Sequence, residues 1–211
     1  MLEHKKIKAD LLVVGGGLAG LCCAVSAARN GLSVVLMHDR SVLGGNASSE
    51  IRMWVCGARG EHNRETGLIE EIMLENYYRN PTKNYFIWDT VLYGIARAEK
   101  NLTLLLDCAA MDAETEAGEF GDGRTVRIKR VTGYQTTTQI FFDVEATYFA
   151  DCSGDSILAP LTGAHFRIGR EGTDEFGEKT SVKEHDDMTM GMSVMVYGRE
   201  TTGEVRFTPP E

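Results

Sequence analysis

The first forty residues alternate between two kinds of apolar pattern. Continuous apolar runs end at Val14 and at Met37, and each is short enough to be a buried strand. Between them, residues 18–28 are apolar on nearly every face of a helix, which predicts a helix buried between a sheet and its neighbours. Asn30-Gly31 then supplies a C-terminal cap. The pattern therefore predicts strand, helix and strand within Ala9–Asp39, the length of one βαβ unit.

Helical spacing returns twice after this unit. Apolar residues recur at intervals of three and four from Arg64 to Asn80-Pro81, and again from about Phe86 to Glu99. Leu102–Leu106 then predicts a third buried parallel strand, and the acidic stretch Glu114–Arg124 predicts a turn. Three β-branched and aromatic segments predict a small antiparallel meander: Thr125–Lys129, Thr137–Phe142 and Thr147–Ala150.

The last part of the chain changes character at Gly163. Before it, small residues and glycine lead from the end of the meander into a short helix at Ser156–Leu161. After it, Arg167–Asp187 is polar and charged, and Met188–Tyr197 predicts a new apolar strand.

Glycines fill the turn between the first strand and its helix, in the order Gly15-x-Gly17-x-x-Gly20. Gly15 permits the sharp turn, Gly17 lets the backbone approach a pyrophosphate, and Gly20 lets the helix pack close to the sheet. Leu18 and Ala19 open the helix, where amide N–H groups and the helix dipole favour an anion. The spacing predicts a nucleotide site, and a glycine turn without a ligand is the alternative.

The end of the second strand carries the residues expected to meet a ribose. A carboxylate at this place in a dinucleotide unit accepts a hydrogen bond from a ribose hydroxyl. Counting from Gly15, the place falls on His38, with Asp39 and Arg40 following. Either the side chain or the backbone of His38 binds the ribose, or Asp39, one residue later, does so. The alternative for Asp39 is a solvent-exposed position in a turn without a role in binding. Arg40 taken alone would favour a 2′-phosphate.

The composition argues against several classes of partner. The 211 residues include 22 basic and 31 acidic side chains, a net charge of −9, so we expect no nucleic acid partner. No glycine-free apolar run reaches the roughly 18 residues of a membrane span, and three adjacent glycines argue against a signal peptide. The five cysteines lack C-x-x-C spacing, so we expect a cytoplasmic protein without a disulfide framework or a metal site.

A glycine pair with small polar neighbours follows the second strand, in the run Leu43-Gly44-Gly45-Asn46-Ala47-Ser48-Ser49-Glu50. Such a stretch can lay backbone N–H groups and short hydroxyls along an extended polar ligand. Together with the three-glycine turn and His38-Asp39-Arg40, it resembles the amino-terminal half of FAD-dependent oxidoreductases of the glutathione-reductase-like fold. It is most similar to the bacterial FAD-dependent oxidoreductase family related to the flavin subunit of heterodisulfide reductase.

The resemblance implies FAD as the cofactor and assigns contacts to it. The backbone of Ala110 would hold the adenine, and residues 53–61 would approach the isoalloxazine ring. Cys152-Ser153-Gly154-Asp155 is similar to the family's Ala-Thr-Gly-Asp, in which Gly154 and Asp155 would approach the FAD, although the departure at Cys152-Ser153 leaves the role of Asp155 open. The pyrophosphate and the ribityl chain would lie beside the glycine-pair loop, at Gly44, Gly45, Asn46, Ala47 and Ser48.

No catalytic residue follows from the sequence. Arg52 could stabilise negative charge on a reduced flavin or a substrate oxygen, and Cys56 could be redox active if its pKa were lowered. The alternatives are structural: Arg52 could pair with Glu50 or Glu61, and Cys56 could pack as a hydrophobic residue.

The predicted fold is α/β, a Rossmann-like FAD/NAD(P)-binding domain with a parallel sheet and an antiparallel β-meander crossover, incomplete at the C-terminus. The resemblance implies a split FAD domain, so residues 1–163 are its first segment and residues 164–211 are a linker and the start of an inserted substrate domain. The expected function is that of an FAD-dependent oxidoreductase, present as an amino-terminal portion, with a small-molecule substrate or an electron-transfer partner. An NAD(P)-dependent dehydrogenase and a non-catalytic nucleotide-binding module are the alternatives. The sequence specifies neither the substrate nor the oligomeric state.

Overall fold

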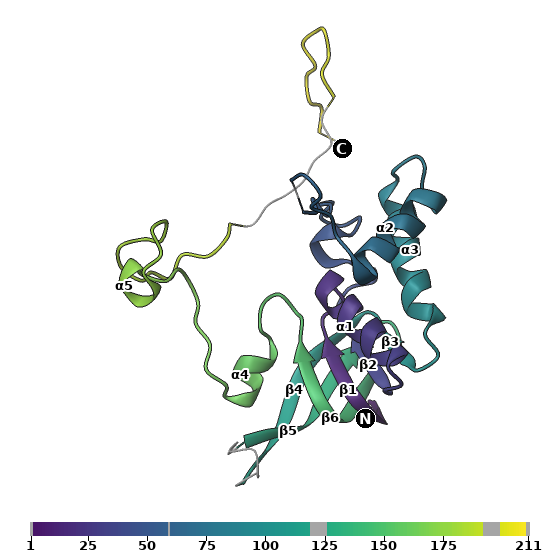
Figure 1. Cartoon of the computed structure of the whole chain (residues 1–211), viewed down its shortest axis with the longest axis vertical. Helices are drawn as coiled ribbons and strands as arrows, with labels where there is room; N and C mark the ends of the chain where they lie inside the picture. The colour runs from purple at the N-terminus through teal and green to yellow at the C-terminus, as the bar shows by residue number, and fades with distance from the viewer. Residues whose placement is uncertain (1, 59, 119–125, 192–198, 210–211) are drawn as a thin grey trace. The chain divides into compact units, whose positions relative to one another are not determined.

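A computed structural model describes residues 2–58, 60–118, 126–191 and 199–209 of the chain. The chain divides into two compact units, residues 1–166 and 167–211 (Figure 1). In the first unit, six strands form one mixed sheet in the order β3-β2-β1-β6-β5-β4. Strands β3, β2, β1 and β6 are parallel neighbours, and β5 and β4 continue the sheet in antiparallel fashion. The strands are β1 (Glu3–Val14), β2 (Val34–Met37), β3 (Leu102–Leu105), β4 (Cys108–Ala117), β5 (Val126–Gln135) and β6 (Ile140–Asp151).

Both faces of the sheet are covered at its centre, which explains why β1 ends in a buried apolar run and why β2 is apolar throughout. Leu11 and Val13 of β1 pack on one face with residues of α1 (Leu18–Arg29) and α3 (Tyr85–Ala98). Leu12 and Val14 pack on the other face with residues of β4, β5, β6 and α4 (Leu158–Thr162). Helix α2 (Gly67–Arg79) lies beside α3 (Figure 1). Consequently all four residues of β2 are buried.

The βαβ unit, the two long helices and the third parallel strand are confirmed, but the meander differs from its prediction in two places. The predicted turn at Glu114–Arg124 is wrong in its described part, because β4 continues to Ala117. Glu114 pairs across the strands with Lys129 and with Arg130, each at 2.9 Å, so the acidic side chain faces opposite charges on β5 and is compatible with a strand.

Residues 140–142 of the predicted segment Thr137–Phe142 and all of Thr147–Ala150 belong to one strand, β6, whereas residues 137–139 lie in the turn before it. Asp143 interrupts the apolar pattern between them, but its buried carboxylate accepts a hydrogen bond from Thr132 Oγ1 at 2.7 Å and lies 3.0 Å from His4 Nδ1. These neighbours allow the strand to continue through an acidic residue. In the predicted strand at Met188–Tyr197, residues 188–191 are not in a strand and residues 192–197 lie outside the described part.

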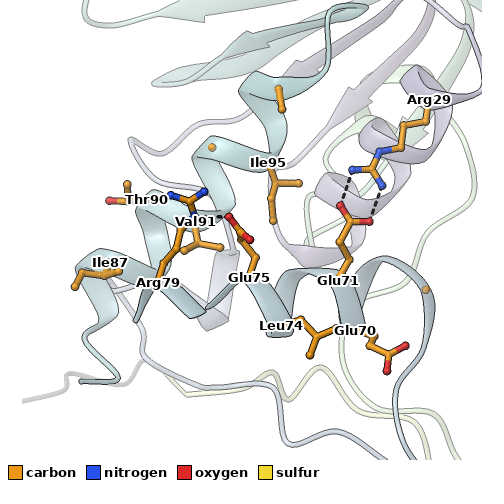
Figure 2. Close-up of a pocket in the computed structure, with 13 residues that line it drawn as sticks. Arg29, Glu70, Glu71, Leu74, Glu75, Arg79, Ile87, Thr90, Val91 and Ile95 are labelled. Carbon is orange, nitrogen blue, oxygen red and sulfur yellow. Dashed lines mark hydrogen bonds and ion pairs between the residues drawn. The ribbon is translucent and has the colours of Figure 1, made fainter. Parts of the chain in front are cut away.

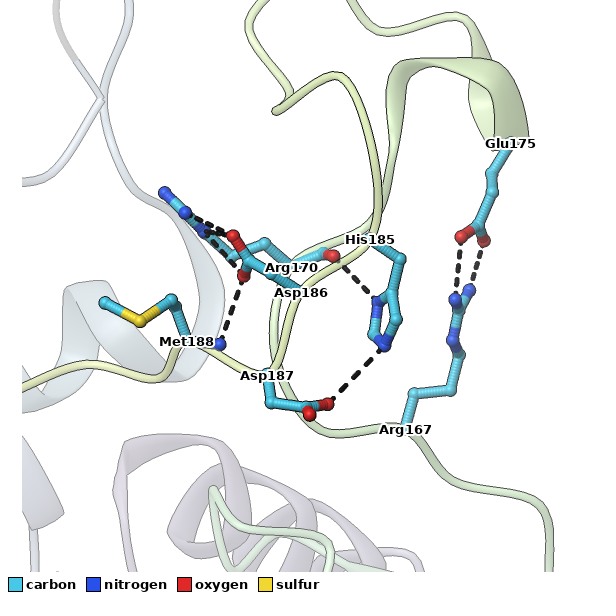
Figure 3. A network of polar contacts seen from close by, with 7 residues as sticks. All are labelled: Arg167, Arg170, Glu175, His185, Asp186, Asp187 and Met188. Carbon is cyan, nitrogen blue, oxygen red and sulfur yellow. Dashed lines mark hydrogen bonds and ion pairs between the residues drawn. The ribbon is translucent and has the colours of Figure 1, made fainter.

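The second unit contains one short helix, α5 (Thr173–Phe176), among its described residues. Polar contacts link its segments (Figure 3). Arg167 pairs with Glu175 and Arg170 with Asp186, while His185 Nδ1 lies 2.9 Å from the carbonyl oxygen of Arg170, to which it donates. Large apolar side chains in this unit are exposed: Ile168, Phe176, Met188, Met190, Val205 and Phe207.

Within the described residues, none of the helices has both the length and the apolar character needed to cross a bilayer.

Candidate functional site

A groove of about 610 Å³ opens where β1, β2 and β6 end at their carboxyl edges. Ligands of open α/β sheets bind at this edge. Four segments line the groove, namely the start of α1, the end of β2, the loop that follows β2, and the turn after β6. Most of the cofactor residues predicted from the sequence are among the lining residues: Gly15, Gly17, Leu18, Ala19, His38, Asp39, Arg40, Gly44, Gly45, Asn46, Ala47, Gly154 and Asp155.

Glycines keep the two main walls of the groove close together and free of side chains. A Cβ on Gly45 would lie 3.1 Å from the Cα of Gly17, and a Cβ on Gly17 would lie 4.0 Å from the Cα of Gly45. Gly44 has φ +110° and forms a parallel bridge with Gly17. The walls are therefore bare backbone at the place where an extended polar ligand would pass, which is the cradle that a pyrophosphate requires.

The start of α1 is suited to an anion. Gly17 caps this helix without a side-chain hydrogen bond, and its first turn contains no acidic residue. Over the 12 residues of α1 the peptide dipoles align, so the N-terminal N–H groups carry partial positive charge. The residues present thus fit a diphosphate.

A second recess of about 180 Å³ continues the groove past the ends of β1 and β2 to Ala110. It shares Gly15, Asp39, Ser153 and Asp155 with the groove. Ala110 lies next to an irregularity in the pairing of β4 with β5. The structure therefore brings Ala110 close to the glycine turn, although about ninety residues separate them in the sequence.

Gly20 and Ser48, which belong to the two sequence motifs assigned to the cofactor, do not line the groove. Both are buried. A Cβ on Gly20 would lie 1.8 Å from the carbonyl oxygen of Gly15, so Gly20 sets how closely α1 packs against the turn. The Ser48 N–H donates to the Gly45 carbonyl at 3.0 Å, so Ser48 shapes the loop from beneath.

Both ring nitrogens of His38 are hydrogen-bonded within the protein. Its ring is buried, Nδ1 accepts a hydrogen bond from the Gly16 N–H at 2.9 Å, and Nε2 lies 3.0 Å from the carbonyl oxygen of Val42. Because an N–H can only donate and a carbonyl can only accept, these two contacts specify the neutral tautomer with its proton on Nε2. Burial, which disfavours the imidazolium, keeps the pKa of His38 below its ordinary value.

Asp39 and Arg40 have different surroundings. The Asp39 side chain is 62% exposed and lines both the groove and the recess, so its carboxylate is available to a ligand. Arg40 Nη1 lies 3.0 Å from the Glu50 carboxylate, so its charge is already paired across the loop. Of the two sequence alternatives for the ribose, the geometry favours Asp39 over the His38 ring.

Asp151 is a structural residue of the site that the sequence analysis did not single out. Its Oδ1 accepts from the N–H of Ser153 at 3.0 Å, and its Oδ2 accepts from the N–H of Leu158 at 2.8 Å. The carboxylate thus holds the turn after β6 against the start of α4. The sequence signal that could have identified it is an Asp directly before the Cys-Ser-Gly turn, because Asp side chains often accept hydrogen bonds from the backbone N–H two residues later.

An aromatic recess of about 200 Å³ adjoins the groove and shares Ala47, Trp54 and Val55 with it. Tyr77, Tyr85 and Trp88 from α2 and α3 line the rest, together with amide side chains. Trp88 of α3 is buried, whereas Tyr77 of α2 and Trp54 of the preceding loop are exposed.

Arg52 and Cys56 stay without an assigned role. Arg52 Nε donates to the carbonyl of Ser49 at 2.9 Å, and its guanidinium lies 5.9 Å from the centre of the Tyr85 ring. Cys56 is exposed, and Met53 rather than Cys56 lines the groove with Trp54 and Val55.

A larger recess, about 960 Å³, lies elsewhere, between α2 and α3 (Figure 2). Its charged residues are paired, with Arg29 on Glu71 at 2.7 Å, Arg79 on Glu75, and Glu70 on Arg64. It contains none of the predicted cofactor residues. Backbone donors and an uncapped helix favour the smaller glycine-walled groove as the ligand site.

Two curated proteins are similar to part of the chain. A glycerol-3-phosphate dehydrogenase of Mycobacterium leprae is 38% identical over 66 residues, which are 31% of this chain and 11% of that protein. A 4-oxocyclohex-2-ene-1-carboxylate 5-dehydrogenase of Sinomonas cyclohexanicum is 43% identical over 58 residues, which are 27% of this chain and 10% of that protein. The matched part thus spans about a tenth of the length of these curated relatives.

Solved structures show the same fold. Thermovibrio ammonificans THI4 superposes with a TM-score of 0.52 at 17% identity, over 84% of this chain and 76% of that one. A geranylgeranyl bacteriochlorophyll reductase-like protein of Thermoplasma acidophilum gives 0.52 at 16% identity, over 79% of this chain and 45% of that one. The predicted α/β fold with a parallel core and an antiparallel β4-β5-β6 meander is confirmed.

The family described as FAD dependent oxidoreductase matches residues 10–207, almost the whole chain. The match includes the glycine turn, the glycine-pair loop and the turn after β6, which together form the groove. The chain therefore belongs to the family of FAD-dependent oxidoreductases.

Proposed function

We propose that the groove holds FAD in an extended form, with the diphosphate between Gly17 and Gly45 at the start of α1. The observation that carries this is the pair of bare glycine walls facing an uncapped helix. Asp39 would accept from the ribose of the adenosine, and the recess at Ala110 would take the adenine. The flavin end would then lie toward Met53, Trp54 and Val55.

The proposed reaction is a redox reaction on a small organic substrate, with electrons passed on to an electron-transfer partner or a second substrate. FAD supplies the redox chemistry when bound, and the protein orients the cofactor and excludes water. The aromatic recess beside Trp54 would limit access to the flavin end of the groove. The substrate class stays open, because the relatives align only over about a tenth of their length.

The test is FAD binding by the full chain and by one variant that fills the groove. Gly17 has φ −61°, which any residue adopts, and a Cβ there would meet nothing closer than 4.0 Å. Gly17→Val should therefore fold normally while its side chain occupies the space of the diphosphate. We expect absorbance titration to show bound flavin in the natural chain and at least about hundredfold weaker binding in the variant.

Gly203→Val is the matched control, because a Cβ at Gly203 in the second unit would meet nothing within 4 Å. This variant should bind FAD as the natural chain does. A natural chain that gains no flavin bands, or a Gly17→Val variant that binds equally well, would contradict the proposal. Competition with NADH distinguishes a nicotinamide enzyme, and bound FAD that dithionite cannot reduce would indicate a non-catalytic module.

A further inference from the structure

A neutral histidine joins the two walls of the groove. The His38 ring accepts a hydrogen bond from the Gly16 N–H at 2.9 Å. On its other side, Nε2 lies 3.0 Å from the carbonyl oxygen of Val42, which is two residues before the glycine pair. Gly16 in turn accepts from the Gly44 N–H at 2.8 Å through its own carbonyl. Ring and backbone thus form a closed set of hydrogen bonds that fixes the glycine turn relative to the loop after β2.

A side chain at position 16 would collide with this ring and with Leu43. A Cβ at Gly16 would lie 2.7 Å from Cγ of His38 and 2.7 Å from a Cδ of Leu43. This position is one of the unspecified places in the three-glycine spacing, so the nucleotide motif does not require glycine there. Gly16, the middle of the three adjacent glycines, and the histidine therefore fit together sterically as well as through the hydrogen bond.

Protonation would break this arrangement. An imidazolium donates from both nitrogens, so its Nδ1–H would face the N–H of Gly16, which cannot accept. Asp39 Oδ1 lies 3.4 Å from the same Nδ1 and would attract the new donor. Protonation would thus release Gly16 and at the same time draw the Asp39 carboxylate away from the ribose position.

The charged groups around the ring act in opposite directions. Burial lowers the pKa of His38 most, Arg40 lowers it further, and Asp39 and Glu50 raise it. The net effect keeps the ring neutral at neutral pH, and protonation is therefore expected only below about 6.5, the ordinary imidazole value.

We propose that His38 is a positioning residue for FAD, which holds the diphosphate-binding turn in place only while its ring is neutral. This inference rests on the proposed function, since it assigns the same groove to FAD. It predicts that FAD affinity falls as the pH drops below the ordinary imidazole range. In the natural chain we expect the dissociation constant for FAD to rise as the pH is lowered from 8, by about tenfold once the ring is fully protonated.

Three substitutions separate the two hydrogen bonds of the ring. His38→Asn places an acceptor near Nδ1 and keeps the bond from Gly16, whereas His38→Gln keeps a donor near Nε2 for Val42, and His38→Ala removes both. At pH 8 we expect His38→Asn to bind FAD within about threefold of the natural chain, and the other two to bind about tenfold more weakly. Because none of the three titrates, the His38-dependent part of the pH effect should disappear in each.

Equal pH dependence in the natural chain and in His38→Asn would overturn the proposal, as would natural affinity in His38→Ala at pH 8. Nitrogen NMR of the His38 ring and hydrogen exchange at the Gly16 amide provide a readout without FAD. We expect Nδ1 to be unprotonated and the Gly16 amide to lose protection in His38→Ala. If the natural chain bound no FAD, the proposed function would fail, whereas an unprotected Gly16 amide in the natural chain would refute the His38 link itself.

Discussion

The two units of the chain are stabilised in different ways. In residues 1–166, alternate residues of four parallel strands pack into apolar clusters on both faces of the sheet. In the described part of residues 167–211, the large apolar side chains are exposed and ion pairs such as Arg170–Asp186 join the segments. Burial of apolar side chains stabilises a fold by kilocalories per residue, whereas exposed ion pairs contribute little.

The site depends on the first kind of structure. Every residue that lines the groove and the adjoining recess at Ala110 belongs to the first unit. The walls of the groove are loops, but each loop begins or ends at a buried strand of the sheet. The comparison therefore predicts that changes to the buried residues that support the groove affect folding, cofactor binding or both, and that changes in the second unit have local effects.

The largest effect is expected from Gly20→Ala in α1. The added Cβ would lie 1.8 Å from the Gly15 carbonyl oxygen, so the helix must move away from the glycine turn that precedes it. We expect a loss of more than about 3 kcal/mol in the free energy of unfolding, together with loss of FAD binding. Chemical denaturation and flavin titration measure the two effects.

Gly94→Ala in α3 is the control, because a Cβ at Gly94 would meet nothing within 4 Å. This second helical glycine should gain about 0.5–1 kcal/mol of stability on the same substitution. Equal effects of the two substitutions would show that helix propensity, rather than close approach to the turn, determines the outcome at Gly20.

A smaller effect is expected from removing one apolar side chain of the sheet. Leu36 of β2 has no exposed surface and belongs to the cluster beneath α1 and α3. Leu36→Ala should lower the free energy of unfolding by about 3 kcal/mol. Phe176→Ala removes a larger side chain from the second unit, but that ring is 67% exposed, and we expect a change within about 0.5 kcal/mol. A comparable loss in both variants would break the distinction between the two units.

The same contrast explains what the sequence could predict. Apolar periodicity indicates buried strands and helices directly in the sequence. The βαβ unit, α2, α3 and β3 were therefore predicted correctly. Where polar residues are stabilised by partners distant in sequence, the pattern misled. Asp143 separated two segments of one strand because His4 and Thr132 were not visible as its neighbours, and Glu114 suggested a turn for the same reason.

The candidate site shows a similar division. Glycine spacing predicted the groove-lining turn, because a close approach of two backbones leaves a local signature. The sequence could not show that the His38 ring is hydrogen-bonded to Gly16 and Val42, because both contacts depend on how the glycine turn and the loop after β2 pack together. Ala110 was assigned through the family resemblance, and its own side chain carries no such signal. The roles of the individual site residues remain predictions.

The smallest effect is expected from the ion pair Arg170–Asp186 in the second unit. The hydrogen bond from Arg170, helped by the Met188 N–H and by His185, lowers the pKa of Asp186 from 3.8 to about 2. The contribution of the pair to stability is therefore complete above the ordinary pKa and is lost as the pH falls through the lowered value. Arg170→Gln should return the Asp186 pKa toward 3.8, as carboxyl NMR titration would show. The Glu175 titration serves as the internal control, because its partner Arg167 remains. Unfolding of the first unit should not shift, and a lowered midpoint would mean that these exposed charges support the sheet after all.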